Sequence, residues 1–353
     1  MSLPAIVIPT FNRPKSLNRL LFSIKQAEFN EFPPIVFSID GGGSKEIVTI
    51  AEQFSWEGEK EIILHDENLG LKSHILKCGD LTERYGAIVL LEDDLFVSKY
   101  FYNYTHEALS FYQDDNDIAG ISLYQYEYLE NVDLPFKALV DGYDTYFIQM
   151  ASSWGQAWSK EQWIGFKSWF KENSVWDNSD KRLPKDVLAW PETSWKKYYI
   201  KYLVDTNRYF VYPRISLTTN FGDAGTNNGY KNSLHQVNIL IGAKTWTFSK
   251  LNQGIKYDVH FELDGDMFKE NLECFSSDES LEMVPFELNK ITGLLHAKNY
   301  ELAKLKIKEQ KFDYKLLFNL SDSTISKIQN ELPSLKIQIK NQLIYTLLKK
   351  LKN

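Results

Sequence analysis

Three adjacent carboxylates, Glu92, Asp93 and Asp94, are the residues of this sequence best suited to chemistry. They directly follow an apolar run at residues 87–91, which is typical of a strand buried on both faces of a parallel sheet. Neighbouring negative charges repel one another and are costly to desolvate. Because hard oxygen ligands suit Mg²⁺ or Mn²⁺, the triplet indicates a divalent-cation site. The alternative is a solvated turn in which Asp94 caps the helix that begins near Ser98.

Two more polar segments follow predicted strands. A strand at residues 3–9 runs into Thr10 and Arg13, and a strand at residues 35–39 ends at Asp40, just before three glycines. A short polar loop with an arginine can contact a diphosphate, and a carboxylate can accept a hydrogen bond from a base N–H or a ribose hydroxyl. Each segment taken alone also fits an ordinary turn or helix start.

These polar segments can meet only if the strands before them end at the same edge of one sheet. The first third of the chain is predicted to contain such strands. Apolar runs alternate with amphipathic stretches, which predicts an α/β fold with a Rossmann-like, mostly parallel twisted sheet flanked by helices. The carboxyl ends of parallel strands are where open α/β sheets bind ligands. The predicted strands of this part lie at residues 3–9, 35–39, 61–65, 87–91 and 118–123.

The composition limits the classes of function. A formal net charge of −7 argues against a general nucleic-acid binder. Cys78 and Cys274 give no disulfide framework, and the N-terminus enters an apolar strand without a charged leader, so we expect a cytoplasmic protein. Residues 333–353 carry five lysines, no acid and one apolar helical face. This stretch could contact an anionic membrane surface peripherally, or pack on the domain as a terminal helix.

In order and spacing, these segments resemble the metal-dependent A-type (GT-A) glycosyltransferases, in particular bacterial family-2-like enzymes and the N-acetylglucosaminyltransferase I family. The motif IPTFNRP, with Pro9 and Thr10, is similar to their first-strand motif, FSIDGG to their second, and LEDDL to their metal-binding D-x-D motif. The segment LGLKSHILKCGD is similar to one that places a helical histidine near the nucleotide, here His74. The resemblance covers about residues 4–230.

The resemblance implies that a sugar is moved with inversion from a nucleotide-sugar donor, which we expect to be UDP-linked, to a saccharide or lipid-linked glycan. Asp94 would bind Mn²⁺ or Mg²⁺, and Glu92 and Asp93 would contact sugar or ribose. Residues 1–123 would then form the nucleotide-sugar half and residues 124–265 the acceptor half of one GT-A domain. A partly helical C-terminal extension would occupy the remaining residues.

Aromatic residues are concentrated in the second half of the chain. Seven of the nine tryptophans lie between Trp154 and Trp195. We expect most of them in the core, and one or two in an acceptor cleft, where flat rings can stack on sugars.

The general base departs from the pattern of the resembled enzymes, which place an aspartate between two aromatic residues. Without gaps, this position holds Lys196 and Lys197, and a lysine cannot act as a base unless its pKa is strongly perturbed. A shift of three residues places Glu192 between two tryptophans, so Glu192 is the candidate base and Asp186 the reserve. The alternative role of Glu192 is to cap the following helix.

Two other classes of function stay open. A sugar-phosphate nucleotidyltransferase has a similar sheet, but its Gly-rich basic loop after the first strand does not correspond to PTFNRPKS. A non-catalytic nucleotide- or glycan-binding module is favoured by the lysines at the expected position of the base. Hydrolysis of a UDP-sugar in the presence of Mn²⁺ would separate an enzyme from such a module.

Overall fold

The structure, a computed structural model, describes residues 3–129, 134–223, 235–261, 286–288 and 295–297. The chain divides into two compact units, Met1–Leu263 and Asp264–Asn353. In the second unit, β14 (Phe286–Leu288) and β15 (Leu295–Ala297) form an antiparallel pair. The predicted C-terminal helical extension and the basic stretch at residues 333–353 lie outside the described residues.

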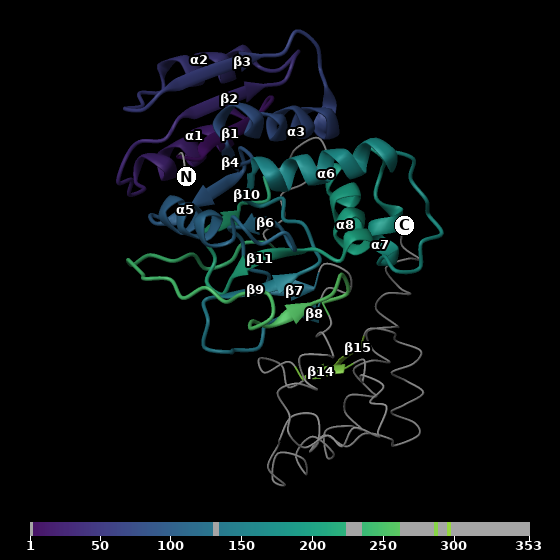
Figure 1. The fold of residues 1–353 in the computed structure, drawn as a ribbon. Coiled ribbons are helices and arrows are strands. Elements are labelled where there is room, and N and C mark those ends of the chain that lie inside the picture. The colour runs from purple at the N-terminus through teal and green to yellow at the C-terminus, as the bar shows by residue number, and fades with distance from the viewer. Residues whose placement is uncertain (1–2, 130–133, 224–234, 262–285, 289–294, 298–353) are drawn as a thin grey trace, which may run out of the picture. The chain divides into compact units, whose positions relative to one another are not determined.

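Nine strands of the first unit form one mixed sheet, in which a parallel group is followed by strands of both directions (Figure 1). The parallel group is ordered β3-β2-β1-β4, and its strands are β1 (Ala5–Thr10), β2 (Ile35–Ile39), β3 (Lys60–Leu64) and β4 (Ala87–Leu90). The order then continues through β10 (Gln156–Ser159), β6 (Ile118–Ser122), β11 (Tyr209–Pro213), β9 (Thr145–Ile148) and β13 (Lys256–Tyr257). The predicted fold class, a mostly parallel sheet flanked by helices, is confirmed.

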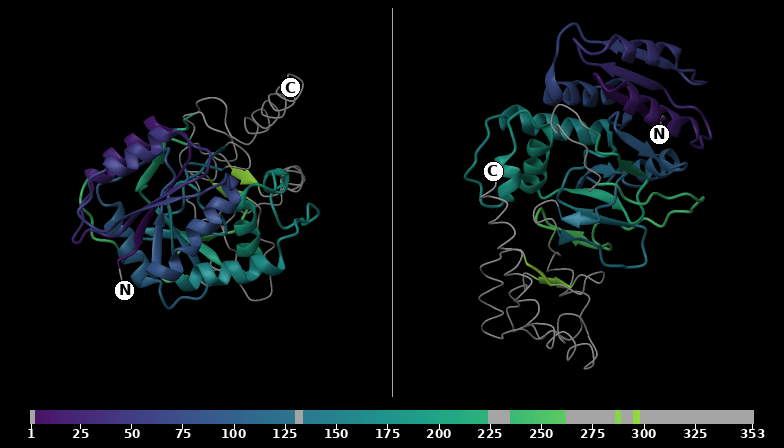
Figure 2. Two further views of the ribbon diagram at one scale, coloured as in Figure 1. Left: turned by 90° about the horizontal axis from the view of Figure 1, so that it is seen from above. Right: turned by 180° about the vertical axis from the view of Figure 1, so that it is seen from behind.

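Helices cover both faces of this sheet (Figures 1 and 2). One apolar core joins the sheet to α1 (Pro14–Lys25), α2 (Lys45–Gln53) and α5 (Phe101–Phe111). The other core joins it to α3 (Gly70–Asp80), α6 (Lys160–Glu172) and α8 (Trp195–Thr206). The short helices are α4 (Thr82–Tyr85) and α7 (Lys185–Ala189). Two small antiparallel pairs complete the unit, β5 (Leu95–Val97) with β12 (Thr218–Asn220) and β7 (Tyr128–Leu129) with β8 (Leu134–Pro135).

Strand β10 is not among the strands predicted from the sequence. Gly155 has a φ of 93°, in the left-handed region that favours glycine, and the chain then forms four residues of strand before α6. Strand β10 inserts antiparallel between β4 and β6, with Gln156 beside Leu90. Its last residue, Ser159, caps α6 in a reciprocal pair of hydrogen bonds with Gln162. The segment around Trp154 is therefore held beside the end of β4.

Three of the seven tryptophans at residues 154–195 are buried, and the other four, Trp154, Trp169, Trp176 and Trp190, are partly buried against the same core. Trp158, Trp163 and Trp195 are at most 2% exposed. Trp158 and Trp195 both pack against Tyr199 of α8, and Trp163 packs against Trp158. In contrast, Trp154 retains part of its surface.

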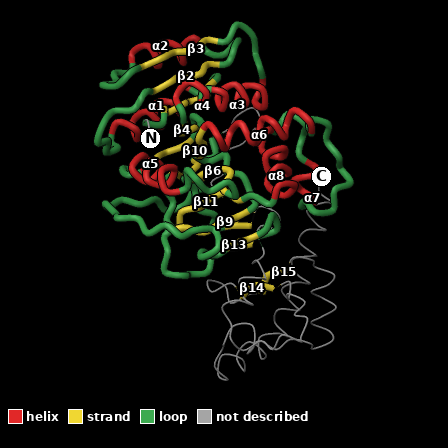
Figure 3. Tube along the Cα trace, viewed as in Figure 1, coloured by secondary structure: helices red, strands yellow, loops and turns green. Residues whose placement is uncertain are grey.

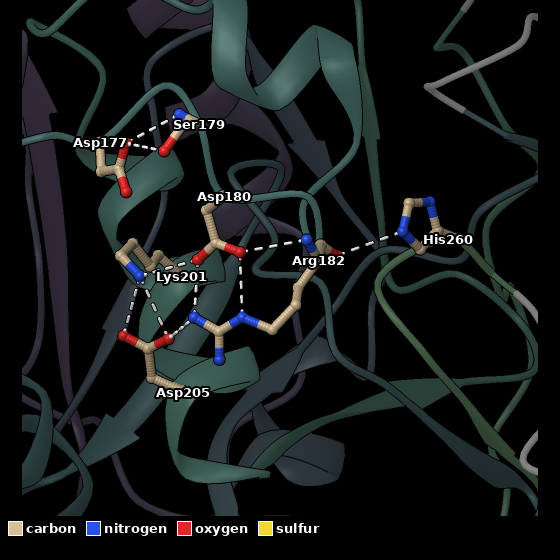
Figure 4. Close-up of polar contacts among 7 residues, drawn as sticks. All are labelled: Asp177, Ser179, Asp180, Arg182, Lys201, Asp205 and His260. Atoms are coloured by element: carbon tan, nitrogen blue, oxygen red, sulfur yellow. Dashed lines mark hydrogen bonds and ion pairs between the residues drawn. The ribbon is translucent and has the colours of Figure 1, made fainter.

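The long loop segment between α6 and α8, which α7 interrupts, is fixed by ion pairs (Figures 3 and 4). Asp180 accepts hydrogen bonds from Arg182 and Lys201, and both cations also bond Asp205 of α8. The hydrogen bond from Arg182 is the main reason why the pKa of Asp180 lies well below its usual range. This cluster ties the segment that carries Asp186 to α8.

Among the described residues, no helix is both long and apolar enough to span a bilayer.

Candidate active site

The three predicted segments meet at one edge of the sheet, because β1, β2 and β4 run parallel and end near one another. Thr10 pairs with Ile39, directly before Asp40, and Val7 pairs with Leu90. Pro9 is buried inside β1, so it has no surface that a ligand could contact. The carboxyl ends of these strands thus carry Thr10, Asp40 and the acidic triplet together, as the sequence predicts.

Arg13 binds the acidic triplet directly. Its guanidinium forms an ion pair with Asp93 Oδ1, and its second nitrogen lies 2.8 Å from Asp94 Oδ2. The other oxygen of Asp93 accepts a 2.8 Å hydrogen bond from the Thr10 hydroxyl. Asp93 is 2% exposed, whereas the Asp94 side chain keeps 14% of its surface. Of these two carboxylates, Asp94 is therefore the more accessible to a ligand.

The triplet is electrostatically strained. Burial raises the pKa of Glu92 to about 8, and Asp94 raises it further while Arg13 opposes the shift. Burial also raises the pKa of Asp93. Burial disfavours the charge of Arg13, but the neighbouring carboxylates outweigh this effect and its pKa is raised. With a pKa of about 8, Glu92 is mainly protonated at pH 7, so the carboxylates of Asp93 and Asp94 set against the single charge of Arg13 leave a smaller negative excess, which a further cation would offset.

The donor set suits a hard divalent cation. Within the described residues, no group of three or more His, Cys, Asp or Glu side chains is arranged to enclose a metal ion. Oxygens of Asp93 and Asp94 nevertheless converge on one cationic group, the guanidinium of Arg13. Mg²⁺ and Mn²⁺ prefer such oxygens and are commonly held by one or two carboxylates, with phosphates and waters as the other ligands. The residues present thus fit a cation shared between the protein and a diphosphate.

Asp40 is more constrained than the sequence suggests. Its Oδ1 accepts hydrogen bonds from the backbone N–H groups of Gly41 (3.0 Å) and Leu69 (2.8 Å), and its Oδ2 accepts one from Gly70 (3.2 Å). Asp40 therefore braces the chain at the start of α3, where Leu69 itself offers no side-chain cap. Oδ2 has capacity for one more hydrogen bond, so a role in binding a nucleotide is compatible with this structural role.

His74 lies inside the molecule, with 5% of its surface exposed. Its Nε2 is 2.8 Å from the Ser38 hydroxyl, which is also 3.0 Å from His65 Nε2. Burial lowers the pKa of His74 to about 4, so the ring is neutral at pH 7. In this arrangement His74 supports β2 just before Asp40.

Neither candidate base is buried. Glu192 and Asp186 are both exposed, Glu192 in the turn before α8 and Asp186 in the first turn of α7. The expected desolvation of Glu192 between Trp190 and Trp195 is not found, because Trp195 turns into the core. The capping alternative is not found either, since α8 begins after Ser194.

Lys196 and Lys197 are nearly fully buried, and both contact aromatic rings. Lys197 Nζ donates to the Trp190 carbonyl at 2.6 Å and lies over the ring of Trp176. Lys196 Nζ lies 5.1 Å from the ring of Trp154 and 5.3 Å from that of Trp190. Its charge also lowers the pKa of Glu92, against the larger effect of burial. The buried cation of Lys196, which lies between the rings of Trp154 and Trp190, is thus close enough to Glu92 to act on its charge.

A fourth carboxylate, Asp223, was missed by sequence reasoning. Asp223 accepts a 2.7 Å hydrogen bond from the Ser16 hydroxyl and forms an ion pair with Arg19, both on α1. The nearby Phe221 N–H donates to the Asp94 carbonyl, at 3.1 Å. Asp223 lies in the stretch NFGDAGTNNG, whose composition indicates only a loop, and no spacing in it shows a return to α1.

Comparisons with known proteins agree with this description. Residues 5–152 match the family model described as Glycosyl transferase family 2. No curated protein sequence matches the chain.

Solved structures to which this chain is similar include S. aureus TarS 1-349 in complex with UDP, at 13% identity and a TM-score of 0.40, over 61% of this chain and 59% of that chain. They also include the mannosyltransferase PcManGT from Pyrobaculum calidifontis in complex with GDP-Man and Mn2+, at 9% identity and a TM-score of 0.34, over 53% and 51%. GalNAc-T7 with UDP, GalNAc and Mn2+ has 12% identity and a TM-score of 0.40, over 60% and 43%. The chain thus spans 59% or less of the length of these three structures.

Residues 5–152 thus match the Glycosyl transferase family 2 model, and the strands among them belong to a Rossmann-like sheet of the GT-A type.

Proposed function

We propose that this chain is a metal-dependent inverting glycosyltransferase that moves a sugar from a nucleotide-sugar donor, UDP-linked in our proposal, to a saccharide or lipid-linked glycan. One observation carries the proposal: Arg13, Asp40 and the acidic triplet lie together at the carboxyl ends of β1, β2 and β4. A family 2 domain over the same residues supports it. We also propose that the chain is similar to the N-acetylglucosaminyltransferase I family.

In this proposal the donor lies across the ends of β1, β2 and β4. Asp94 holds a Mn²⁺ or Mg²⁺ ion, which when bound neutralises the charge of the departing diphosphate. Glu92 and Asp93 contact the sugar or the ribose, and Asp40 offers its remaining lone pair to the nucleoside. Arg13 supplies a second positive charge to the diphosphate. His74 acts from the interior, where it keeps β2 and Asp40 in position.

A carboxylate removes the proton of an acceptor hydroxyl while the hydroxyl oxygen attacks the anomeric carbon. The bond to the diphosphate oxygen breaks on the opposite face, which inverts the configuration. Glu192 is the proposed base and Asp186 the reserve. Their exposure means that the bound acceptor itself would have to exclude water from the carboxylate. One or two of the partly exposed tryptophans are proposed to contact the acceptor sugar; Trp154 is among them, although its ring also stacks on His235 at 4.3 Å.

For the setting of the reaction, we propose polysaccharide biosynthesis in a bacterial cytoplasm, with peripheral membrane contact through the basic residues 333–353. The support is the cysteine usage and the lysine-rich, apolar pattern of that stretch.

The test is a panel of UDP-, GDP-, CMP- and dTDP-sugars, followed by thermal shift and by release of free sugar in Mn²⁺ or in EDTA. The proposal expects one nucleotide class to stabilise the protein and to be slowly hydrolysed in Mn²⁺ only, and Asp94→Ala to abolish both effects. Stabilisation without turnover, even with a broad panel of glycan acceptors, would indicate a binding module. Release of pyrophosphate from a nucleoside triphosphate and a sugar phosphate would instead indicate a nucleotidyltransferase.

A further inference from the structure

The guanidinium of Arg13 occupies the place between Asp93 and Asp94 where a bound cation would be expected. Its two nitrogens reach Asp93 Oδ1 and Asp94 Oδ2, and its side chain is 23% exposed. Thr10 fixes the second oxygen of Asp93, so this carboxylate cannot turn away without losing a hydrogen bond. Arg13 itself immediately precedes α1, and its carbonyl accepts the hydrogen bond of Leu17. The backbone of Arg13 is thus fixed, while its long side chain can adopt other rotamers.

A divalent cation and this guanidinium compete for the same oxygen. Asp94 Oδ2, on the most accessible carboxylate of the pair, is the oxygen that Arg13 holds. Two cationic centres on one carboxylate also repel each other strongly where water is largely excluded. Arg13 therefore opposes the binding of a metal ion to Asp94 Oδ2, and this binding is favoured when Arg13 leaves.

The surroundings make Arg13 the cation that can move. Arg19, one and a half turns further along α1, is held by its ion pair with Asp223 and lies 4.0 Å from the centre of the Phe221 ring. The main chain of Asp94 is fixed by the N–H of Phe221. Arg19 and the Asp94 backbone can thus stay in place while the side-chain partner of Asp94 changes.

We propose that Arg13 is a resident counter-cation of the acidic triplet, which a divalent ion displaces and which then passes to the diphosphate of the donor. This inference rests on the proposed function of the same site. It predicts that metal and nucleoside diphosphate bind with positive coupling. In the free protein the metal displaces Arg13 without compensation, whereas with nucleotide present the displaced guanidinium gains a new anionic partner.

The test measures Mn²⁺ affinity by electron paramagnetic resonance, with and without UDP, in the intact chain. Arg13→Gln should bind Mn²⁺ at least about tenfold more tightly than the wild type when UDP is absent, because the competing charge is gone. UDP should strengthen Mn²⁺ binding in the wild type and do so much less in Arg13→Gln. Arg13→Lys, which keeps the charge, should stay close to the wild type. Arg84→Gln is the matched control, because Arg84 also pairs with carboxylates but lies on exposed surface.

Unchanged or weaker Mn²⁺ binding in Arg13→Gln, with native circular dichroism, would overturn the inference. If Arg13→Gln does not fold, two other results would overturn the inference. The first is a wild type in which UDP does not strengthen Mn²⁺ binding. The second is a wild type that shows this coupling and an Arg13→Lys protein that does not. These outcomes concern Mn²⁺ binding alone. The proposed function fails separately, when no nucleotide sugar is turned over in Mn²⁺, and the two failures are therefore distinguishable.

Discussion

Replacing Asp40 by alanine should weaken both the fold and the nucleotide site. Its carboxylate accepts three backbone N–H groups, from Gly41, Leu69 and Gly70. A hydrogen bond to a charged group contributes about 1.5–3 kcal/mol, so three of them would sum to roughly 4–9 kcal/mol. The amides of Leu69 and Gly70 are only partly buried, and water can replace part of this sum. We therefore expect Asp40→Ala to lower the free energy of unfolding by about 2–4 kcal/mol.

The assay is urea unfolding followed by tryptophan fluorescence, combined with hydrogen exchange at Leu69 and Gly70. Asp40→Asn keeps one acceptor oxygen and should lose about half as much stability as Asp40→Ala. Asp66→Asn is the matched control, because Asp66 is exposed, and its effect should stay within about 0.5 kcal/mol. In Asp40→Ala, exchange at the two amides should accelerate before global unfolding.

Calorimetry with UDP separates the two roles of Asp40. If its free oxygen contacts the nucleoside, Asp40→Ala should weaken UDP and UDP-sugar about equally, by roughly 1–3 kcal/mol. Unfolding of Asp40→Ala at the wild-type urea midpoint would refute the structural reasoning. A loss that affects only the sugar part of the donor would refute the nucleoside contact.

Three further predictions concern the core, the pH dependence and the base. Gly79→Ala should cost roughly 3 kcal/mol or more by urea unfolding, because the new Cβ would lie 2.0 Å from the Trp163 ring, whereas Gly242→Ala, in open space, should be nearly neutral. The pKa of His74 is about 4 in the folded protein and about 6.5 in the unfolded chain. The unfolded chain therefore binds more protons below pH 6.5, and the free energy of unfolding decreases as the pH is lowered from about 6.5 to about 4. At pH 5 this amounts to about 2 kcal/mol, and the acid loss should be correspondingly smaller in His74→Gln; equal losses would exclude it. Glu192→Gln should keep less than about a tenth of the wild-type kcat and bind the donor normally. A higher kcat would exclude Glu192 as the base, and Asp186 would then be tested in the same way.

The sheet and the location of the site were predictable because the signals are local. An apolar run followed by acids, as at residues 87–94, reports both a buried strand and its carboxyl end. Apolar runs also report the carboxyl ends of β1, which ends at Thr10, and of β2, which ends directly before Asp40. Parallel strands then place these residues at one edge without further information.

The partners of the site residues were not predictable, because they depend on contacts between distant parts of the chain. No pattern places Arg13 on Asp94 rather than in solvent, or brings Asp223 back to Arg19. Strand β10 was missed because its four residues are followed directly by an amphipathic helix whose periodicity dominates the region. Glu192 lies between Trp190 and Trp195 in the sequence, but Trp195 turns into the core and Glu192 stays exposed.

The central claim is that the acidic triplet binds a nucleotide diphosphate through a divalent cation, and UDP calorimetry with Mn²⁺ or EDTA tests it most directly. The account predicts that UDP binding to the wild type is at least about tenfold tighter in Mn²⁺ than in EDTA, and that Asp94→Ala removes this difference without unfolding. Equal UDP affinity in Mn²⁺ and EDTA for the wild type, or a Mn²⁺ effect that persists in Asp94→Ala, would contradict it.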